Sequence, residues 1–208
     1  NFSKMNNVAV KESSGDLLLF LNDDTKILPK SKNWLNEMVS ILQQDDVGAV
    51  GPKLLFGDDT IQHAGMTFLT TGSGFHPFMK LDDETKGYHN LANIMKDCSA
   101  VTGACLLTKR NIFEQIGEYD EDFDVYYGDS DLCLKIRDAG YRVVYTPFAK
   151  VLHDGSRTIR GRYFFNYFAV ESHQRFMEKW NYLKDGDPFY HPMLDWDYSL
   201  IEKFDNVI

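Results

Sequence analysis

The segment Gly15–Thr25 constrains the fold of this chain most strongly, because an apolar run ends abruptly in a polar cluster, GDLLLFLNDDT. The apolar run Leu17–Leu21 follows a glycine and predicts a buried β-strand. Its end would deliver the adjacent carboxylates of Asp23 and Asp24 to a sheet edge, where open α/β sheets bind ligands. Without a Lys or Arg in residues 17–25, a divalent cation would best balance these two charges. Asn-Asp-Asp is also good turn chemistry, so this segment alone leaves both interpretations open.

The composition predicts one globular domain with a substantial core, since 43% of the 208 residues are hydrophobic. A net charge of −9 without a basic tract argues against nucleic acid as a partner. Cys98, Cys105 and Cys133 are odd in number and lack metal-type spacing, which favours a reducing, cytoplasmic setting over a disulfide framework. We find neither a signal peptide nor a run approaching the roughly 20 apolar residues of a membrane span. Docking at the inner face of a membrane is compatible with these features.

Helical and strand patterns alternate along the chain, which predicts the α/β class. Residues 61–90 have no sustained period, and irregular segments of this length are often functional. His63 and His76 lie in this segment and are interpreted as surface or hydrogen-bonding residues, because neither belongs to a spaced cluster. We expect helices over residues 1–14, 32–44, 109–116, 132–139 and 161–183, and strands over 17–21, 47–56, 101–108, 141–145 and 150–155.

Two further polar groups follow later in the chain. Asp129 and Asp131 stand immediately before the helix expected at residue 132, where the helix dipole favours acids and where one of them could act as N-cap. His153 follows a short apolar run in the same way as the Asp pair does. Each group is a weak indication of function by itself.

Together and in this order, these segments resemble the family 2 glycosyltransferases, in particular the rhamnosyltransferase-like bacterial branch that builds surface polysaccharides. The resemblance extends over most of residues 1–160. It is carried by GDLLLFLNDDT at 15–25, VTGACLLTKRNIFEQIGEYDEDF at 101–123, YGDSDLCLKIRDAGYRVVYTP at 127–147 and VLHDGS at 151–156. It implies a GT-A-like mixed sheet flanked by helices, with a helical, aromatic-rich C-terminal extension.

The resemblance also implies a metal site. Asp24 falls at the carboxylate of the family's metal motif, and His153 matches the late histidine that can complete the binding of Mn²⁺ or Mg²⁺. Asn22 and Asp23 would then lie near the ribose and diphosphate of the donor.

A second group of residues would act on the sugar. Asp129 matches the family's general base, although Gly128 stands where the family has glutamate. Asp131 would orient the acceptor or cap the helix, and the turn containing Gly103 would form a wall against the donor sugar.

The implied activity is inverting, metal-dependent transfer of a sugar from a UDP- or dTDP-linked donor to a saccharide or lipid-linked acceptor in cell-surface polysaccharide synthesis. A catalytically silent carbohydrate-binding or assembly module, or an inactive fragment of such an enzyme, is the alternative from another class. A metal-dependent phosphohydrolase is disfavoured because the closely clustered Asp and His residues of a two-metal site are missing.

Compared with that family, the chain lacks the strand and turn that grip the nucleoside. We therefore expect residues 1–160 to form the C-terminal two-thirds of a GT-A domain and residues 161–208 to be a helix and tail packing on it. A sheet without its first strands would expose an edge, which favours self-association.

Overall fold

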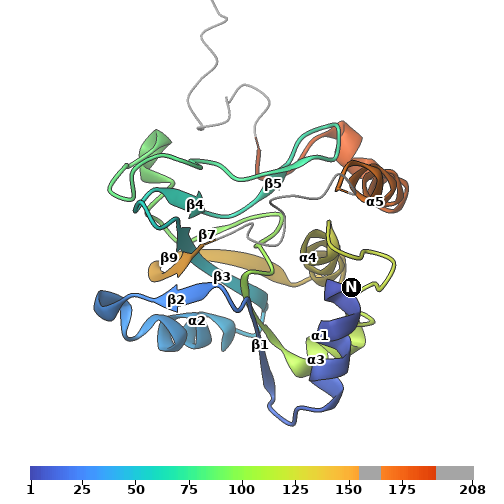
Figure 1. Cartoon of the computed structure of the whole chain (residues 1–208), viewed down its shortest axis with the longest axis horizontal. Coiled ribbons are helices and arrows are strands. Elements are labelled where there is room, and N and C mark those ends of the chain that lie inside the picture. Colours follow the sequence, from blue (N-terminus) through green and yellow to red (C-terminus); the bar gives the residue numbers. More distant parts are fainter. Residues whose placement is uncertain (155–164, 191–208) are drawn as a thin grey trace, which may run out of the picture.

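A central mixed sheet organises the fold of the computed structural model, which describes residues 1–154 and 165–190 (Figure 1). Its strand order is β1-β8-β3-β9-β2, with β4 paired to β3 and β7 paired to β9. Strands β3 and β9 are parallel, whereas the other pairs are antiparallel. The strands are β1 (Leu17–Leu21), β2 (Thr25–Ile27), β3 (Val47–Leu55), β4 (Ile61–His63), β7 (Lys96–Asp97), β8 (Cys105–Lys109) and β9 (Arg142–His153), and β5 (Thr67–Phe68) pairs with β6 (Gly74–Phe75) in a separate small sheet. The expected mixed α/β class is confirmed.

Helices cover both faces of this sheet (Figure 1). All residues of β3 are buried. Its consecutive residues Ala49 and Val50 point to opposite faces of the sheet and belong to two different hydrophobic clusters. One cluster contains α2, and the other contains α1, α3, α4 and α5. The helices are α1 (Phe2–Lys11), α2 (Trp34–Leu42), α3 (Arg110–Gln115), α4 (Gly128–Asp138) and α5 (Phe165–Lys179), with short 3-10 helices η1 (Pro29–Ser31), η2 (Tyr88–Asn90) and η3 (Asn181–Asp185).

The edge strand β1 is less buried than its apolar sequence predicts. Leu18 and Phe20 are buried, but 41% of Leu17 and 44% of Leu21 is exposed. Among the described residues β1 pairs with β8 alone, so one of its edges is not hydrogen-bonded to another strand. The expected strand is present over the predicted residues, but burial is confirmed only for Leu18 and Phe20, because the strand borders the sheet.

Strand β9 is continuous where two separate strands were expected. Thr146 lies opposite Pro52 of β3, and Lys150 lies opposite the next residue, Lys53. The three intervening residues are left outside this ladder, so Pro147 occupies an irregularity in which its missing N–H is tolerated. The strand therefore continues to His153, which it carries toward the end of β1.

Other boundaries move by a few residues. The strand expected at 101–108 begins at Cys105, and the helix expected at 132 begins at Gly128, so that both acids lie in its first turn. The division expected at residue 160 and most of the expected tail lie outside the described residues. Phe176, Trp180 and Leu183 of the C-terminal part belong to the same core cluster as the rest of the chain.

Two features expected from composition can be compared with the structure. All three cysteines are buried and free. Within residues 1–154 and 165–190, none of the helices has the length and apolarity that crossing a membrane requires.

Candidate active site

A tight turn at the end of β1 positions the polar cluster. The backbone N–H and hydroxyl of Thr25 both donate to the carbonyl of Asn22, over 3.3 and 2.7 Å. The backbone N–H of Asn22 in turn donates to Ala104 over 3.0 Å. The segment is thus a turn, as its composition allows, and the same turn brings its side chains to the end of β9.

Pairing of β2 with β9 places Asp24 beside His153. Thr25 lies directly opposite His153 in this ladder, and the N–H of Asp154 donates to the carbonyl of Asp24. As a result, Asp24 Oδ1 lies 3.0 Å from His153 Nε2, and the amide nitrogen of Asn22 lies 3.3 Å from the same atom. The structure therefore brings together three of the predicted site residues.

Gln62 on β4 fixes the orientation of the His153 ring. Its amide nitrogen donates to the His153 carbonyl over 3.1 Å, and its Oε1 contacts His153 Nδ1. Since Leu54 pairs with His63 and Leu55 with Ile61, Gln62 is the extra residue of a β-bulge. Bulges of this kind redirect a side chain next to a functional site.

This arrangement fits a bound cation. Because the Gln62 amide points its oxygen at the ring, Nδ1 of His153 must carry a proton. In the neutral ring Nε2 then presents its lone pair to the carboxylate of Asp24, an arrangement of two acceptors that a shared cation would stabilise. One carboxylate and one such imidazole suit Mn²⁺ or Mg²⁺, which complete their shells with waters and substrate phosphates.

The protein contributes few ligands of its own to this site. Among the described residues no cluster of three or more His, Cys, Asp or Glu side chains could hold a metal. Asp24 and His153 are partly buried, with 21% and 12% of their side chains exposed, whereas Asp23 is exposed. Asp23 therefore lies beside the cluster, and its expected contact with the donor stays a prediction.

Asp129 lies in the first turn of α4 and is held by backbone amides. Its Oδ2 accepts from the N–H of Gly103 over 2.8 Å, and its Oδ1 accepts from the N–H of Ser130 over 2.7 Å. A Cβ added to Gly103 would lie 3.2 Å from the Asp129 Cβ and 3.1 Å from the Phe2 ring, so glycine permits this close approach. Gly103 thus supports the carboxylate, and its expected role as a wall for the donor sugar stays a prediction.

The turn at residues 102–104 links the two halves of the site. Gly103 binds the side chain of Asp129, and the next residue, Ala104, accepts the backbone N–H of Asn22. Two consecutive residues therefore connect the end of β1 with the start of α4. The predicted base and the segment that carries the predicted metal ligands are thus connected through this turn.

Asp131 requires a correction, because it is fully buried and its carboxylate contacts the C-terminal part of the chain. Its Oδ1 accepts from Trp180 Nε1 over 2.9 Å and from Lys179 Nζ over 2.8 Å. No side-chain cap forms at the N-cap residue, Tyr127. Asp131 therefore neither caps α4 nor reaches an acceptor; it fastens the C-terminal end of α5 to α4.

Tyr127 is the second contact between α5 and the start of α4. It adopts a left-handed backbone with φ of 67°, which is uncommon outside glycine. Its ring stacks on Phe176 with centroids 4.5 Å apart, and its hydroxyl lies 2.9 Å from His173 Nδ1. Helix α5 thus holds the residue two positions before Asp129.

His63 and His76 are hydrogen-bonding residues, one of the two expected alternatives, and they bond to each other instead of lying free at the surface. His63 is fully buried and His76 is partly buried, and their Nδ1 atoms lie 2.9 Å apart. The sequence signal for this pair is weak, because the two residues lie 13 positions apart in a segment without a regular period.

Comparisons with known proteins agree with this architecture. A family model described as "Glycosyltransferase like family" matches residues 1–180. The O-antigen biosynthesis protein RfbC of Myxococcus xanthus is 38% identical over 203 residues, which cover 93% of this chain and 15% of that protein. The N-acetylglucosaminyl-diphospho-decaprenol L-rhamnosyltransferase of Mycobacterium tuberculosis is 31% identical over 146 residues, which cover 66% of this chain and 47% of that protein. The chain thus spans less than half the length of either relative.

A solved structure of GalNAc-T7 with UDP, GalNAc and Mn²⁺ superimposes with a TM-score of 0.55. The match covers 72% of this chain and 30% of that one, at 15% sequence identity. At this identity the likeness concerns the fold alone, and it confirms the GT-A-like architecture.

Proposed function

Because this chain belongs to the family described as "Glycosyltransferase like family", we propose that its site transfers a sugar from a UDP- or dTDP-linked donor to a hydroxyl of a saccharide or lipid-linked acceptor. The observation that carries the proposal is the approach of the Asp24 carboxylate to Nε2 of His153 over 3.0 Å, because these two groups together suit a divalent cation. The names of both relatives, which concern O-antigen and a diphospho-decaprenol acceptor, support a role in cell-surface glycan synthesis.

Asp24 and His153 would hold Mn²⁺ or Mg²⁺, with Asn22 contributing a polar contact at the same place. Bound there, a divalent cation would act as a Lewis acid and stabilise the charge of a diphosphate leaving group. The side chains of the protein position and orient this site: Gln62 fixes the ring of His153, and the turn at residues 22–25 fixes Asp24.

Asp129 is the proposed general base. The acceptor oxygen forms a bond to the anomeric carbon, the bond from that carbon to the diphosphate oxygen breaks, and the hydroxyl proton passes to the Asp129 carboxylate. The amides of Gly103 and Ser130 orient this carboxylate, and Oδ2, which accepts from Gly103 alone, keeps a further lone pair for the acceptor. Attack from the face opposite the leaving group inverts the anomeric configuration, and no covalent nucleophile is required.

We further propose that the protein works in the cytoplasm and approaches the inner face of the membrane. The lipid-linked acceptor in the name of the M. tuberculosis relative supports this location.

The test is an assay of sugar released from UDP-glucose, UDP-N-acetylglucosamine and dTDP-rhamnose in the presence of Mn²⁺, with water as acceptor. The Asp129→Ala variant should release sugar about 10²–10⁴-fold more slowly than the wild type. Proton NMR of the first-formed sugar should show the inverted anomer. Asp138→Asn, which changes an exposed acid at the other end of α4, is the matched control.

Two results would contradict this proposal. An unchanged rate of sugar release in Asp129→Ala would contradict the assignment of Asp129 as the general base. Sugar binding by the folded wild type without any turnover would favour a silent carbohydrate-binding module.

A further inference from the structure

The segment from residue 25 to residue 36 differs in charge from the rest of the chain. It contains three lysines and no acidic residue, although the whole chain carries a net charge of −9. Lys26 Nζ lies 3.6 Å from an Asp154 carboxylate oxygen. Lys30 and Lys32 are exposed, and neither forms an ion pair within the part of the chain that the structure describes. The segment is therefore a local positive region on an acidic protein.

An exposed aromatic side chain lies beside these lysines. Phe148 is 63% exposed, although Pro147 and Ala149 on either side of it are buried. These three residues form the irregularity of β9, and the backbone N–H of Phe148 donates to Thr146 Oγ1 over 3.3 Å. An irregularity of this kind redirects a side chain, and here it directs a large apolar ring toward solvent.

Both features line one open groove of about 480 Å³. Lys30, Lys32 and Phe148 line it together with Lys150 and Glu37. The Lys150 ammonium is already paired over 2.6 Å with a carboxylate from outside the groove. Among the described lining residues, Glu37 is then the only acid that opposes Lys30 and Lys32. The groove therefore combines positive charge with an exposed apolar ring.

We propose that this basic groove, defined by Lys30, Lys32 and Phe148, docks the protein on a bilayer that contains anionic phospholipids. The negative potential of such a bilayer attracts lysines near its surface, and an apolar ring beside them can enter the boundary between headgroups and acyl chains. A soluble phosphate ion would use the two lysines but would leave the exposed ring in water. The combination of both features thus favours a lipid surface as the partner.

This inference deepens the proposed function, on which it rests. Phe148 and His153 lie on the same strand, which extends by about 3.4 Å per residue, so their Cα atoms are at most about 17 Å apart. Docking at the basic groove would hold the proposed metal site close to the lipid surface, from which a lipid-linked acceptor extends.

Co-sedimentation of the full chain with vesicles tests the proposal. At low salt the wild type should bind vesicles of equal parts phosphatidylglycerol and phosphatidylcholine, and should bind vesicles of phosphatidylcholine alone about tenfold more weakly. Added salt should weaken binding to the anionic vesicles, because it screens the lysines from the lipid charge. Absence of binding of the folded wild type to the anionic vesicles at low salt would overturn the proposal.

Two double variants separate local charge from net charge. Lys30→Gln combined with Lys32→Gln should weaken binding to the anionic vesicles about 10–30-fold. Lys4→Gln combined with Lys86→Gln removes two exposed lysines elsewhere and changes the net charge equally, so its binding should stay near that of the wild type. Equal weakening by both double variants would show that net charge alone acts, and would overturn the docking surface.

A second pair of variants tests the apolar ring. Phe148→Ser should weaken binding to the anionic vesicles about tenfold, because the ring then no longer leaves water. Met5→Ser, which changes a side chain that is 68% exposed on α1, is the matched control. Unchanged vesicle binding in Phe148→Ser would overturn the proposal. Self-association without vesicles that Phe148→Ser abolishes in sedimentation velocity would assign the groove to a second copy of the chain, and would overturn it as well.

Failure of this inference and failure of the proposed function are distinguishable. Vesicle binding is measured without nucleotide, whereas nucleotide binding is measured by titration with UDP and dTDP in the presence of Mn²⁺ and without vesicles. Nucleotide binding without vesicle binding would overturn this inference alone. Failure of the folded chain to bind either nucleotide would overturn the proposed function, and with it the role of the basic groove in bringing that site to a lipid-linked acceptor.

Discussion

Gln62 connects a single side chain to the strength of the proposed metal site. It holds Nδ1 of His153 and thereby leaves Nε2 available as a ligand. Loss of such an outer contact typically lowers metal affinity 10–100-fold. We therefore expect Gln62→Leu to weaken Mn²⁺ binding by about this factor, measured by electron paramagnetic resonance titration in the presence of UDP.

Gln62→Glu separates the two contacts of this side chain, because a carboxylate still accepts the proton of His153 Nδ1 but no longer donates to the His153 carbonyl. Its Mn²⁺ affinity should stay near that of the wild type. A Gln62→Leu variant that binds Mn²⁺ as tightly as the wild type would show that His153 does not depend on this contact.

The sequence identified some of these residues and not others. Asp24 and His153 each follow an apolar run, and the structure places their side chains together. Gln62 carries no such signal, because its role comes from a bulge in a segment without a period. Asp131 was assigned a wrong role, since only the packing of α5 shows that its carboxylate is buried.

At the scale of elements, the contact between α4 and the C-terminal end of α5 stabilises the fold. Asp131 accepts a charge-assisted hydrogen bond from Lys179 and a buried hydrogen bond from Trp180. Hydrogen bonds that involve charged groups contribute about 1.5–3 kcal/mol each. Asp131→Asn should therefore lower the free energy of unfolding by about 1–3 kcal/mol, measured by urea denaturation.

The same variant should keep its affinity for UDP with Mn²⁺ at temperatures where it is folded. Asp138→Asn, at the exposed end of the same helix, should change neither quantity. A loss of UDP binding in folded Asp131→Asn would reinstate a direct role for this carboxylate.

Two ion pairs connect the irregular segment 61–90 to the sheet. The carboxylate of Asp83 lies 3.0 Å from Nζ of the fully buried Lys53 on β3 and 2.6 Å from Nζ of Lys150 on β9. Burial would raise the pKa of Asp83, but the hydrogen bonds from Lys150 and Lys53 outweigh burial and lower it.

Because the folded-state pKa of Asp83 is depressed, its contribution to stability is present above the unfolded pKa and is lost as the pH falls through the folded one. Wild type should thus be more stable than Asp83→Asn at pH 7, and the difference should shrink below about pH 4. Urea denaturation curves of both proteins at pH 7 and pH 3 measure this difference in the free energy of unfolding. A difference that grows toward pH 3 would contradict the assignment.

Element types were easier to predict than their limits. The periodic segments that became α2 and β3 were identified, since hydrophobic spacing is a local property. The continuity of β9 through Pro147 was missed, because it depends on the register with β3. The edge position of β1 depends in the same way on which strands are adjacent to it.

At the scale of the whole molecule, the edge of β1 favours association with another strand. Leu17 and Leu21 are exposed beside this edge. Leu21→Lys should therefore weaken concentration-dependent self-association, measured by sedimentation velocity. Ile27→Lys, which changes an exposed residue on β2 at the other side of the sheet, is the control. Equal sedimentation of wild type and Leu21→Lys at all concentrations would contradict an interface at β1.

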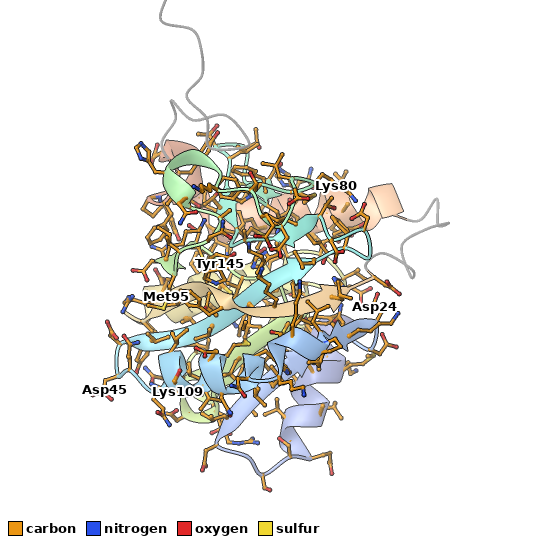
Figure 2. All side chains as sticks on the ribbon, turned by 90° about the vertical axis from the view of Figure 1, so that its left-hand side faces the viewer. Asp24, Asp45, Lys80, Met95, Lys109 and Tyr145 are labelled. Atoms are coloured by element: carbon orange, nitrogen blue, oxygen red, sulfur yellow. The ribbon has the colours of Figure 1, made fainter. Side chains whose placement is uncertain are left out.

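The site as a whole is assembled from distant segments at one end of the sheet. Figure 2 shows Asp24 at this end and Asp45 at the opposite one. The two acids therefore offer a matched pair of variants, since only Asp24 lies beside His153.

Calorimetric titration of the chain with UDP and dTDP, with Mn²⁺ or with EDTA, tests the proposed metal-dependent donor site most directly. We predict binding of one nucleotide with Mn²⁺, no binding with EDTA, loss of binding in Asp24→Ala and retention in Asp45→Asn. Absence of binding to a folded sample, or binding that neither EDTA nor Asp24→Ala affects, would contradict a donor site at Asp24 and His153.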